Sequence, residues 1–328
     1  MKAYVIEQAG GPEVLQLRDI PSVAPNAEEV RIRVRAFGLN RAEVYRRAGK
    51  MGPVAGQVVP GIEAVGEVIE DRSGTFRIGK RVATAMGGLQ FSRNGSYAEE
   101  VTVLRSNVID LDGTSLSWEE LAALPESYLT VWGALGRLID TVPGQTVLVR
   151  GATSSVGQAA VAYAKVRGQR VLATTRSAAN AARLTTIGAD AVIIDSGEVS
   201  DQVRVAAPEG VDVVLEVVGA ATVRDSLKAL KPFGTAVVIG LLGGAPVLEN
   251  LHLMNDLPAA TRLAFFPSGL FGTAALPASD APLNWIAGQV ASGAMPSLRV
   301  QTFDFDDVRR AHSLIESDRA IGKLVVMV

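Results

Sequence analysis

One regularity constrains the fold of this chain more than any other. Between residues 142 and 267, short apolar runs alternate with alanine-rich stretches that have helical spacing. The apolar runs lie at 146–150, 170–175, 191–195, 211–218 and 236–241, and the helical stretches at 156–167, 180–187 and 223–230. Strands that alternate with helices form a parallel sheet with helices on both faces. The middle of the chain is therefore predicted to be a doubly wound α/β domain.

The two ends of the chain follow a different pattern. Up to about residue 107, β-rich runs at 30–36, 62–70 and 81–85 are separated by glycine and proline, which predicts a small β-barrel. After residue 267 the chain shows helical and strand patterns, which are expected to complete this barrel domain. They are helices at 282–292 and 305–317 and strands at 299–303 and 323–328.

A chain of 328 residues is long enough for two domains. Ser117 has a glutamate three residues later, the spacing of a helix N-cap, so we place a boundary just before it. The expected domains are 1–115 together with 268–328, and 116–267.

Composition narrows the possible partners. The chain has 48% hydrophobic and 20% charged residues but no apolar run approaching about 20 residues, and its first residues lack a secretory signal pattern. The net charge of −2 offers no broad basic surface for nucleic acid or an anionic membrane. We expect a cytoplasmic protein with a small-molecule substrate.

A metal site is not expected. The sequence contains no cysteine, which removes disulfides and thiolate ligands, and its two histidines, His252 and His312, are 60 residues apart. Neither histidine lies in a motif, so both are expected to have surface or core roles.

The clearest chemical signal is the segment 147–157, an apolar strand that runs into a small-residue turn and then a helix. Small side chains allow the backbone to approach a pyrophosphate, whose charge meets free N–H groups at the helix N-terminus. The glycine positions of the GxGxxG pattern are occupied by Ala152, Ser154 and Gly157, and Ser155 adds a further hydroxyl. A tight turn without a ligand is the alternative.

The next predicted strand ends in Thr175 and Arg176. NAD-specific folds place an acid at this point to accept the ribose hydroxyl, whereas a guanidinium can hold a phosphate with two parallel hydrogen bonds. NADPH is therefore favoured over NADH. The alternative is that Arg176 is a solvated loop residue.

Further motifs extend over nearly the whole chain, among them VPGIEAVGEV at 59–68 and NGSYAE at 94–99. The set comprises residues 38–49, 59–68, 94–99, 124–134, 147–157, 211–219, 234–244 and 319–326. In this order the motifs resemble the zinc-independent, quinone oxidoreductase-like branch of the medium-chain dehydrogenase/reductase superfamily. The resemblance implies a Rossmann domain inserted into a GroES-like β-barrel domain, an active site in the cleft, and a homodimer joined near residues 262–266.

The resemblance also implies site residues. The cofactor-binding residues would be Thr130, Ala152, Ser154, Ser155, Val156, Gly157, Thr175, Arg176, Val218, Gly240, Leu241, Phe266, Arg319 and Lys323. Among them, Leu241 and Phe266 would pack around the nicotinamide, Lys323 would meet the pyrophosphate, and Arg319 would assist at the phosphate end. Asn40 stands where zinc-dependent relatives have their first ligand, and it would lie near the nicotinamide or the acceptor carbonyl.

The sequence departs from the family around the expected phosphate. Relatives often have a lysine where this chain has Asn180, with Arg183 one helical turn further, and some have a tyrosine where it has Asp195. An acid so close to a 2′-phosphate would weaken the preference for NADPH.

The expected chemistry is hydride transfer without a metal, with the cofactor as the hydride carrier. Tyr45 is the first candidate to protonate the acceptor and Tyr128 the second, while a structural role for either tyrosine and a proton from solvent remain open. Glu63 is expected to hold a turn rather than to act in catalysis.

The predicted function is NADPH-dependent reduction of quinones or related carbonyl acceptors. One alternative is reduction of α,β-unsaturated carbonyls as an enone or enoyl reductase. The other is a non-catalytic NADPH-binding protein.

Overall fold

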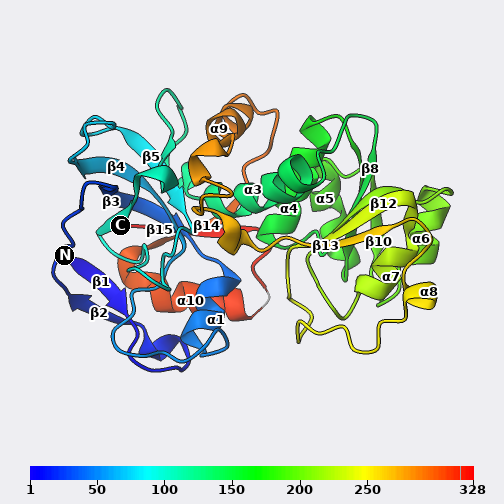
Figure 1. Cartoon of the computed structure of the whole chain (residues 1–328), viewed down its shortest axis with the longest axis horizontal. Helices are drawn as coiled ribbons and strands as arrows, with labels where there is room; N and C mark the ends of the chain where they lie inside the picture. Colours follow the sequence, from blue (N-terminus) through cyan, green and yellow to red (C-terminus); the bar gives the residue numbers. More distant parts are fainter. Residues whose placement is uncertain (318) are drawn as a thin grey trace. The chain divides into compact units, whose positions relative to one another are not determined.

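The computed structural model describes residues 1–317 and 319–328, and the chain forms two compact units (Figure 1). The first comprises Met1–Leu129, Gly269–Gly293 and Ser297–Val328, and the second comprises Thr130–Ser268 and Ala294–Pro296. No helix among the described residues is both long and apolar enough to span a bilayer.

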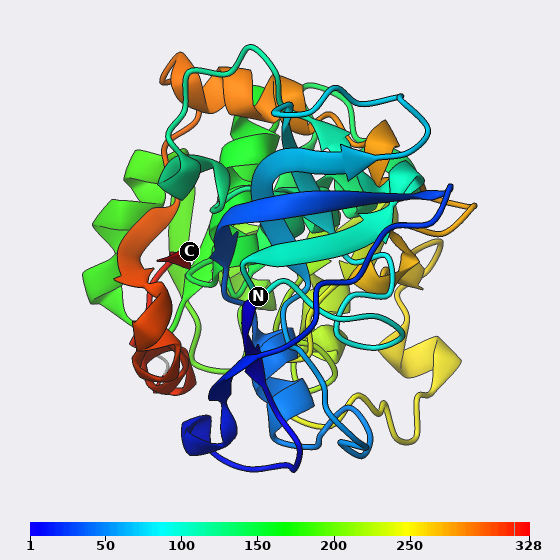
Figure 2. The same ribbon diagram turned by 90° about the vertical axis from the view of Figure 1, so that its left-hand side faces the viewer.

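The first unit is built on one sheet with the order β14-β15-β3-β4-β5-β7, in which β3 also pairs with β6. Its strands are β3 (Glu29–Gly38), β4 (Glu63–Asp71), β5 (Arg81–Ala85), β6 (Glu100–Leu104), β7 (Ile109–Asp110), β14 (Arg299–Asp304) and β15 (Lys323–Met327). A separate antiparallel pair consists of β1 (Lys2–Val5) and β2 (Gln16–Asp19). In Figure 2 the long β3, in blue, lies between β4 and β6.

Strand β3 organises this unit. It alternates buried and more exposed side chains, and it pairs with β4, β6 and β15. The last strand of the described chain, β15, is antiparallel to β3, so the two ends of the sequence share one sheet. Buried apolar side chains from these strands, such as Ile32, Phe37, Val68 and Val326, form its core.

The second unit is a parallel sheet with the order β10-β9-β8-β11-β12-β13. Its strands are β8 (Thr146–Arg150), β9 (Arg170–Thr175), β10 (Ala191–Ile194), β11 (Val211–Glu216), β12 (Leu230–Val238) and β13 (Arg262–Phe265). This is the 3-2-1-4-5-6 order of dinucleotide-binding folds. The predicted doubly wound sheet is confirmed, and its core contains Leu148, Leu172, Val214 and Ala236.

The helices join and cover these sheets. The α-helices are α1 (Arg41–Arg47), α2 (Trp118–Leu121), α3 (Pro125–Val131), α4 (Ser155–Val166), α5 (Ala181–Ile187), α6 (Ser200–Ala206), α7 (Val223–Lys228), α8 (Leu253–Asp256), α9 (Leu283–Ala291) and α10 (Val308–Glu316). A π-helical stretch covers Trp132–Leu138. Short 3-10 turns occupy Pro12–Val14, Arg105–Asn107, Ala178–Asn180, Ser268–Leu270, Ala278–Asp280 and Phe305–Asp307.

The structure differs from the expected boundaries in two places. Residues 116–129 belong to the first unit rather than the second, because α2 packs on β3, β4, β14 and β15. Strand β12 begins at Leu230 rather than at residue 236. Pro232 and Gly234 lie in its first part. Because both residue types are unusual inside a strand, the sequence pattern did not predict a strand there.

Candidate functional site

The turn after β8 has the geometry of an anion site. Gly151 has a φ of 82° and ends the strand, and Ser154 caps α4. The Ser154 hydroxyl donates to the Gly151 carbonyl oxygen at 2.9 Å and accepts from the Gly157 amide at 3.0 Å. This hydroxyl therefore fixes the turn and is not free for a ligand, contrary to the expectation that it would donate to the cofactor.

Gly157 allows the strand and helix to approach closely. A Cβ at this position would collide with the Gly151 carbonyl oxygen and lie 2.7 Å from the Cα of Ala152. Ser155 and Val156 are partly exposed, and their amides have no acceptor among the described residues. Free amides in the first turn of a helix of this length bind a phosphate.

Several other predicted cofactor residues follow the strands of the same sheet. Thr175, Val218 and Gly240 lie at or just after the carboxyl ends of β9, β11 and β12, the edge at which ligands of such sheets bind. A Cβ at Gly219 would lie 2.8 Å from the Gly240 carbonyl oxygen, so these two loops pack tightly. Leu241, the next residue, is partly exposed.

The end of β9 presents one guanidinium to solvent. The Thr175 hydroxyl donates to the Ser177 carbonyl oxygen and accepts from the Ser177 amide, at 3.1 and 3.2 Å, and so shapes the loop. Arg176 is exposed and has no hydrogen bond or ion pair within the described chain. The Nε of Arg183, in contrast, donates to Gln158 on α4 at 3.0 Å.

Two further candidates are buried in the second unit. Thr130 is 3% exposed and Phe266 is 4% exposed. A Cβ at Gly133 would overlap the Cζ end of the Phe266 ring, so that end of the ring packs against the π-helical stretch. Phe266 is therefore held in place by its own unit.

Sequence analysis missed Arg150, a fully buried arginine at the end of β8. Its Nε lies 3.0 Å from Asp195 and its Nη1 lies 2.7 Å from Asp225. Burial alone would lower the pKa of this guanidinium, but hydrogen bonding to Asp195 and the charges of Asp195, Glu216 and Asp225 raise it. The sequence does indicate a buried ion pair here, because a charged residue within an apolar strand requires buried partners.

In the first unit, Asn40 lies in a buried polar cluster. Its Nδ2 donates to Glu63 at 2.8 Å and to Glu43 at 3.3 Å, while its Oδ1 accepts from Lys323 at 2.5 Å. Its backbone amide donates to Glu43, which makes Asn40 the cap of α1. Both amide hydrogens are therefore directed at carboxylates and not at an acceptor carbonyl.

The same cluster buries an ion pair. Lys323 Nζ lies 2.5 Å from Glu63 Oε1, and both side chains are fully buried. The other Glu63 oxygen accepts from the Glu126 amide at 2.8 Å. The structure thus gives Glu63 the expected structural role, because every contact made by its carboxylate holds neighbouring segments together.

The expectation that Lys323 meets the pyrophosphate is not supported. Strand β15 places Lys323 beside Gly38, where a Cβ would overlap the lysine Cε and lie 2.8 Å from the Ala122 carbonyl oxygen. The ammonium therefore points into the protein. Arg319 remains exposed, and its Nε donates to Ser317 at 3.2 Å.

Glu43 carries the most strongly shifted carboxyl of this cluster. Its pKa is raised to about 8, chiefly by complete burial and further by the charge of Glu63, while Lys323 and the hydrogen bond from Asn40 oppose the shift. Burial therefore favours the neutral form of the Glu43 carboxyl at neutral pH.

The two candidate proton donors differ in environment. Tyr45, on α1, is partly exposed, and the Nζ of Lys50 lies 5.7 Å from its ring centroid. Tyr128 is fully buried, burial raises its pKa, and its hydroxyl has no hydrogen-bond partner in the described part of the chain. Tyr45 is the more accessible donor.

The histidines have the roles expected of them. His252 is exposed, whereas His312 is buried with its Nε2 3.0 Å from the Tyr97 hydroxyl. Burial, with a smaller contribution from the Arg47 charge, lowers the pKa of His312 to about 3. His312 is therefore neutral at physiological pH.

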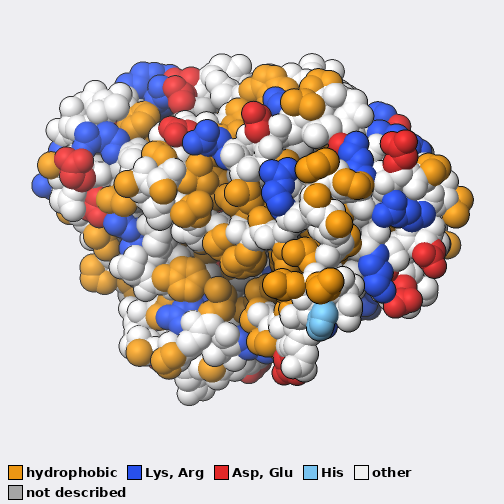
Figure 3. All heavy atoms as spheres, turned by 45° about the vertical axis from the view of Figure 1, so that its right-hand side comes forward, with side chains coloured by type: hydrophobic (Ala, Val, Ile, Leu, Met, Phe, Trp, Pro, Cys, Tyr) orange, Lys and Arg blue, Asp and Glu red, His pale blue; other side chains and the backbone are white. Residues whose placement is uncertain are grey.

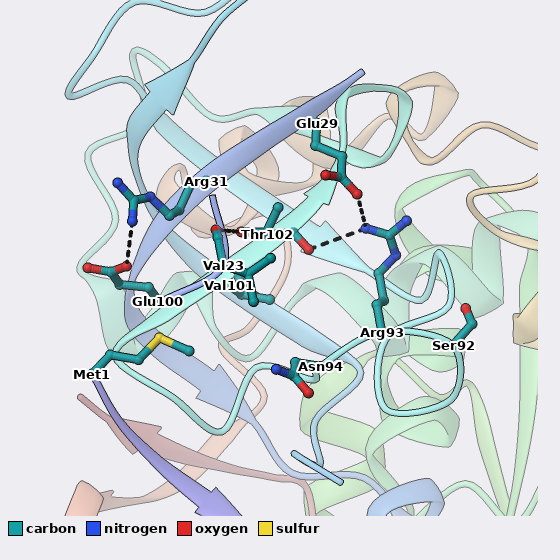
Figure 4. A pocket seen from close by; sticks show the side chains of 10 residues that line it. All are labelled: Met1, Val23, Glu29, Arg31, Ser92, Arg93, Asn94, Glu100, Val101 and Thr102. Carbon is teal, nitrogen blue, oxygen red and sulfur yellow. Dashed lines mark hydrogen bonds and ion pairs between the residues drawn. The ribbon is translucent and has the colours of Figure 1, made fainter. Parts of the chain in front are cut away.

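A hollow of 310 Å³ in the first unit lies apart from all these residues (Figure 4). Two arginines that line it are already paired: Arg93 donates to Glu29 at 3.0 Å, and Arg31 donates to Glu100 at 3.3 Å. No residue that lines it is a predicted site residue.

Comparison with known proteins identifies both units. Residues 26–115 match the family described as alcohol dehydrogenase GroES-like domain, and residues 155–266 match the family described as zinc-binding dehydrogenase. The structure of Escherichia coli quinone oxidoreductase complexed with NADPH aligns over 100% of both chains, with a TM-score of 0.88 and 25% identity. The chain belongs to the medium-chain dehydrogenase/reductase superfamily. The predicted resemblance and fold are confirmed.

Curated members of the superfamily match over part of their length. Human quinone oxidoreductase is 31% identical over 226 residues, which cover 66% of each chain. The rat synaptic vesicle membrane protein VAT-1 homolog is 31% identical over 233 residues, which cover 67% of this chain and 54% of the relative. These matches therefore span about half to two thirds of the curated relatives.

The residues of this chain do not fit the zinc site of the zinc-dependent members. Those members use cysteine and histidine ligands, whereas this sequence has no cysteine and no histidine before residue 252. The Lys323 ammonium bonds to Asn40, so a fixed cation already occupies that donor. Among the described residues, no cluster of three or more histidine, aspartate or glutamate side chains could hold a metal ion.

Proposed function

We propose that this chain is an oxidoreductase that uses NADPH to reduce a quinone or a related carbonyl acceptor. The observation that carries the proposal is the turn between β8 and α4, where Gly157 permits close backbone approach and two amides remain free. The family relationship and the NADPH complex of the Escherichia coli structure support the same cofactor.

The residues around this turn would hold the cofactor. The amides of Ser155 and Val156 would bind the pyrophosphate, and the guanidinium of Arg176 would bind the ribose phosphate. Leu241 and Phe266 would supply apolar surface to the nicotinamide. When bound, NADPH supplies the hydride, so the protein's contribution is orientation and exclusion of water.

The first unit would provide the groups that face the acceptor. Tyr45 would donate a proton to the carbonyl oxygen, and bulk water is the alternative source. Asn40 would act through the position of α1, because its amide hydrogens are held by Glu43 and Glu63. We therefore infer that the first unit provides acceptor groups, while the second unit contains most cofactor residues.

We also propose a homodimer joined through β13. This strand is the last in its sheet, and its outer edge pairs with no other strand of the described chain. Phe265 on it is 58% exposed, and further apolar side chains, including Leu253 and Met254, are exposed in the same unit. Figure 3 shows apolar side chains in orange among charged ones on the side of the molecule that it draws. A Phe265→Glu variant should sediment as a monomer.

The function is tested by following the absorbance of NADPH with the purified chain. Benzoquinone, phenanthrenequinone and a simple enone are added in turn, with NADH as the control cofactor. Oxidation of NADPH by the quinones supports the proposal. Consumption of the enone alone favours the enone or enoyl reductase, and binding without turnover favours a non-catalytic protein. A cytoplasmic location stays a prediction.

A further inference from the structure

The buried Arg150 lies next to the part of the sheet that would receive the ribose phosphate. It is the last residue of β8, and its side chain is fully buried. None of its contacts is with the turn at 151–157. Its guanidinium instead reaches the segments that follow β10 and precede α7.

Arg150 binds Asp195 with two parallel hydrogen bonds. Its Nε lies 3.0 Å from Asp195 Oδ2, and its Nη2 lies 3.2 Å from Asp195 Oδ1. The Gly197 amide also donates to Oδ1, at 2.9 Å. Both oxygens of this carboxylate are thus engaged, and it forms an ion pair with a guanidinium that it shares with Asp225.

The guanidinium cannot easily turn away from Asp195. Its Nη1 donates to Asp225 at 2.7 Å, to the Thr222 carbonyl oxygen at 3.0 Å and to Ser226 at 3.1 Å. Its Nη2 donates to the Gly197 carbonyl oxygen at 2.7 Å. These contacts fix the plane of the guanidinium, and therefore also the direction in which the Asp195 carboxylate points.

Asp195 is close to the expected phosphate site along the backbone. Its amide donates to the Thr175 carbonyl oxygen at 2.8 Å, and Arg176 follows directly. An acid near this position accepts the ribose hydroxyl of NAD and repels a phosphate. The sequence alone therefore contains a conflict, because Arg176 favours a phosphate and Asp195 opposes it.

We propose that Arg150 determines cofactor choice by holding the Asp195 carboxylate in an ion pair, which leaves Arg176 free to receive the 2′-phosphate of NADPH. Arg150 is a positioning residue in this proposal, since it acts on the phosphate site through Asp195. The inference rests on the proposed use of NADPH, and it assigns that preference to a residue outside the binding loop.

The experiment compares NADPH and NADH affinities of the full chain by isothermal titration. The variants are Arg150→Gln, Asp195→Asn and the double variant. In Arg150→Gln the freed acid should lower the NADPH to NADH affinity ratio by about tenfold or more. The double variant removes the acid as well, and its ratio should return to within about threefold of the wild type. A merely structural arginine would not give this rescue.

Asp195→Asn keeps the proposal testable if Arg150→Gln fails to fold, which thermal unfolding would reveal. Because the carboxylate is already held by Arg150 in the wild type, this variant should change the ratio by less than about threefold. A rise of about tenfold would mean that Asp195 opposes the phosphate despite Arg150, and it would overturn the inference.

The outcomes separate this inference from the proposed function. If the wild type binds neither cofactor, the proposed function is refuted and the inference with it. If the wild type prefers NADPH and folded Arg150→Gln keeps the same ratio, the inference alone is refuted. The inference is also refuted if Arg150→Gln loses the preference for NADPH and the double variant does not restore it. In that case Arg150 would not act through Asp195.

Discussion

Replacement of Lys323 by methionine tests the buried cluster most directly. The ammonium lies 2.5 Å from both Glu63 and Asn40, and the lysine and glutamate side chains are fully buried. Methionine retains much of the apolar length but leaves the Glu63 carboxylate, among the described residues, with the N–H donors of Asn40 and Glu126. An uncompensated buried charge of this kind costs about 3–5 kcal/mol of unfolding free energy.

The double variant Lys323→Met/Glu63→Gln shows whether that cost comes from the charge. With both charges removed, the loss should fall to about 1–2 kcal/mol, the cost of imperfectly paired polar groups. Urea denaturation followed by circular dichroism measures both values. Lys2→Met, at an exposed position of the same unit, is the matched control and should change stability by less than about 0.5 kcal/mol.

This experiment also distinguishes the structure from the sequence-based expectation for Lys323. A lysine that bound pyrophosphate would weaken NADPH affinity when replaced but leave the free energy of unfolding nearly unchanged. A stability loss below about 1 kcal/mol in Lys323→Met, or no recovery in the double variant, would refute the buried ion pair.

Three further predictions concern pH and the cofactor. Glu43 has a folded pKa of about 8 against a usual 4.5, so the folded state retains a proton that the unfolded state releases, and stability falls as pH rises through this window. Relative to Glu43→Gln, the free energy of unfolding of the wild type should fall by about 1.4 kcal/mol per pH unit between pH 5 and 7, as measured by urea denaturation. Parallel plots of unfolding free energy against pH for the two proteins would contradict this. Gly157→Ala should weaken NADPH binding and lower the free energy of unfolding by about 1–3 kcal/mol, because the new Cβ would meet backbone atoms of residues 151 and 152. Titration measures the binding and thermal unfolding measures the stability. Unchanged values would contradict the close approach of the strand and the helix at this turn. Arg176→Ala should weaken NADPH binding by about tenfold or more without affecting NADH binding. The control Arg183→Ala should have a smaller effect, because the Arg183 guanidinium is hydrogen-bonded to α4. Equal losses of NADPH affinity in the two variants would refute the assignment of Arg176.

The parallel sheet and its turn could be predicted because their signals are local. The alternation of apolar and helical stretches gave the second unit, and the small residues that end in Gly157 gave the turn into α4. Each of these features depends on neighbours within a few residues. The end of the strand at Thr175 was predicted in the same way, whereas a cofactor role for Thr175 and Arg176 stays a prediction.

The buried cluster could not be predicted in this way. Lys323 and Asn40 are 283 residues apart, and only the pairing of β15 with β3 brings them together. The periodicity of neither segment indicates that contact, so Lys323 was expected to meet the pyrophosphate. For Arg150, the sequence allows part of the prediction. Its charge within an apolar strand indicates a buried partner, but nothing in the sequence identifies that partner as Asp195.

The pairing of β15 with β3 also sets an order of events during synthesis. Residues 1–129 emerge from the ribosome first, but the strand that covers one edge of β3 and the cation that neutralises Glu63 are supplied by residues 323–327. All of the second unit, including residues 294–296, is synthesised before that strand. Contacts between distant segments are slow to form, and domains generally fold as units. The second unit should thus fold before β15 has been synthesised. Until then the first unit lacks the strand that pairs with β3, and Glu63 lacks its partner Lys323.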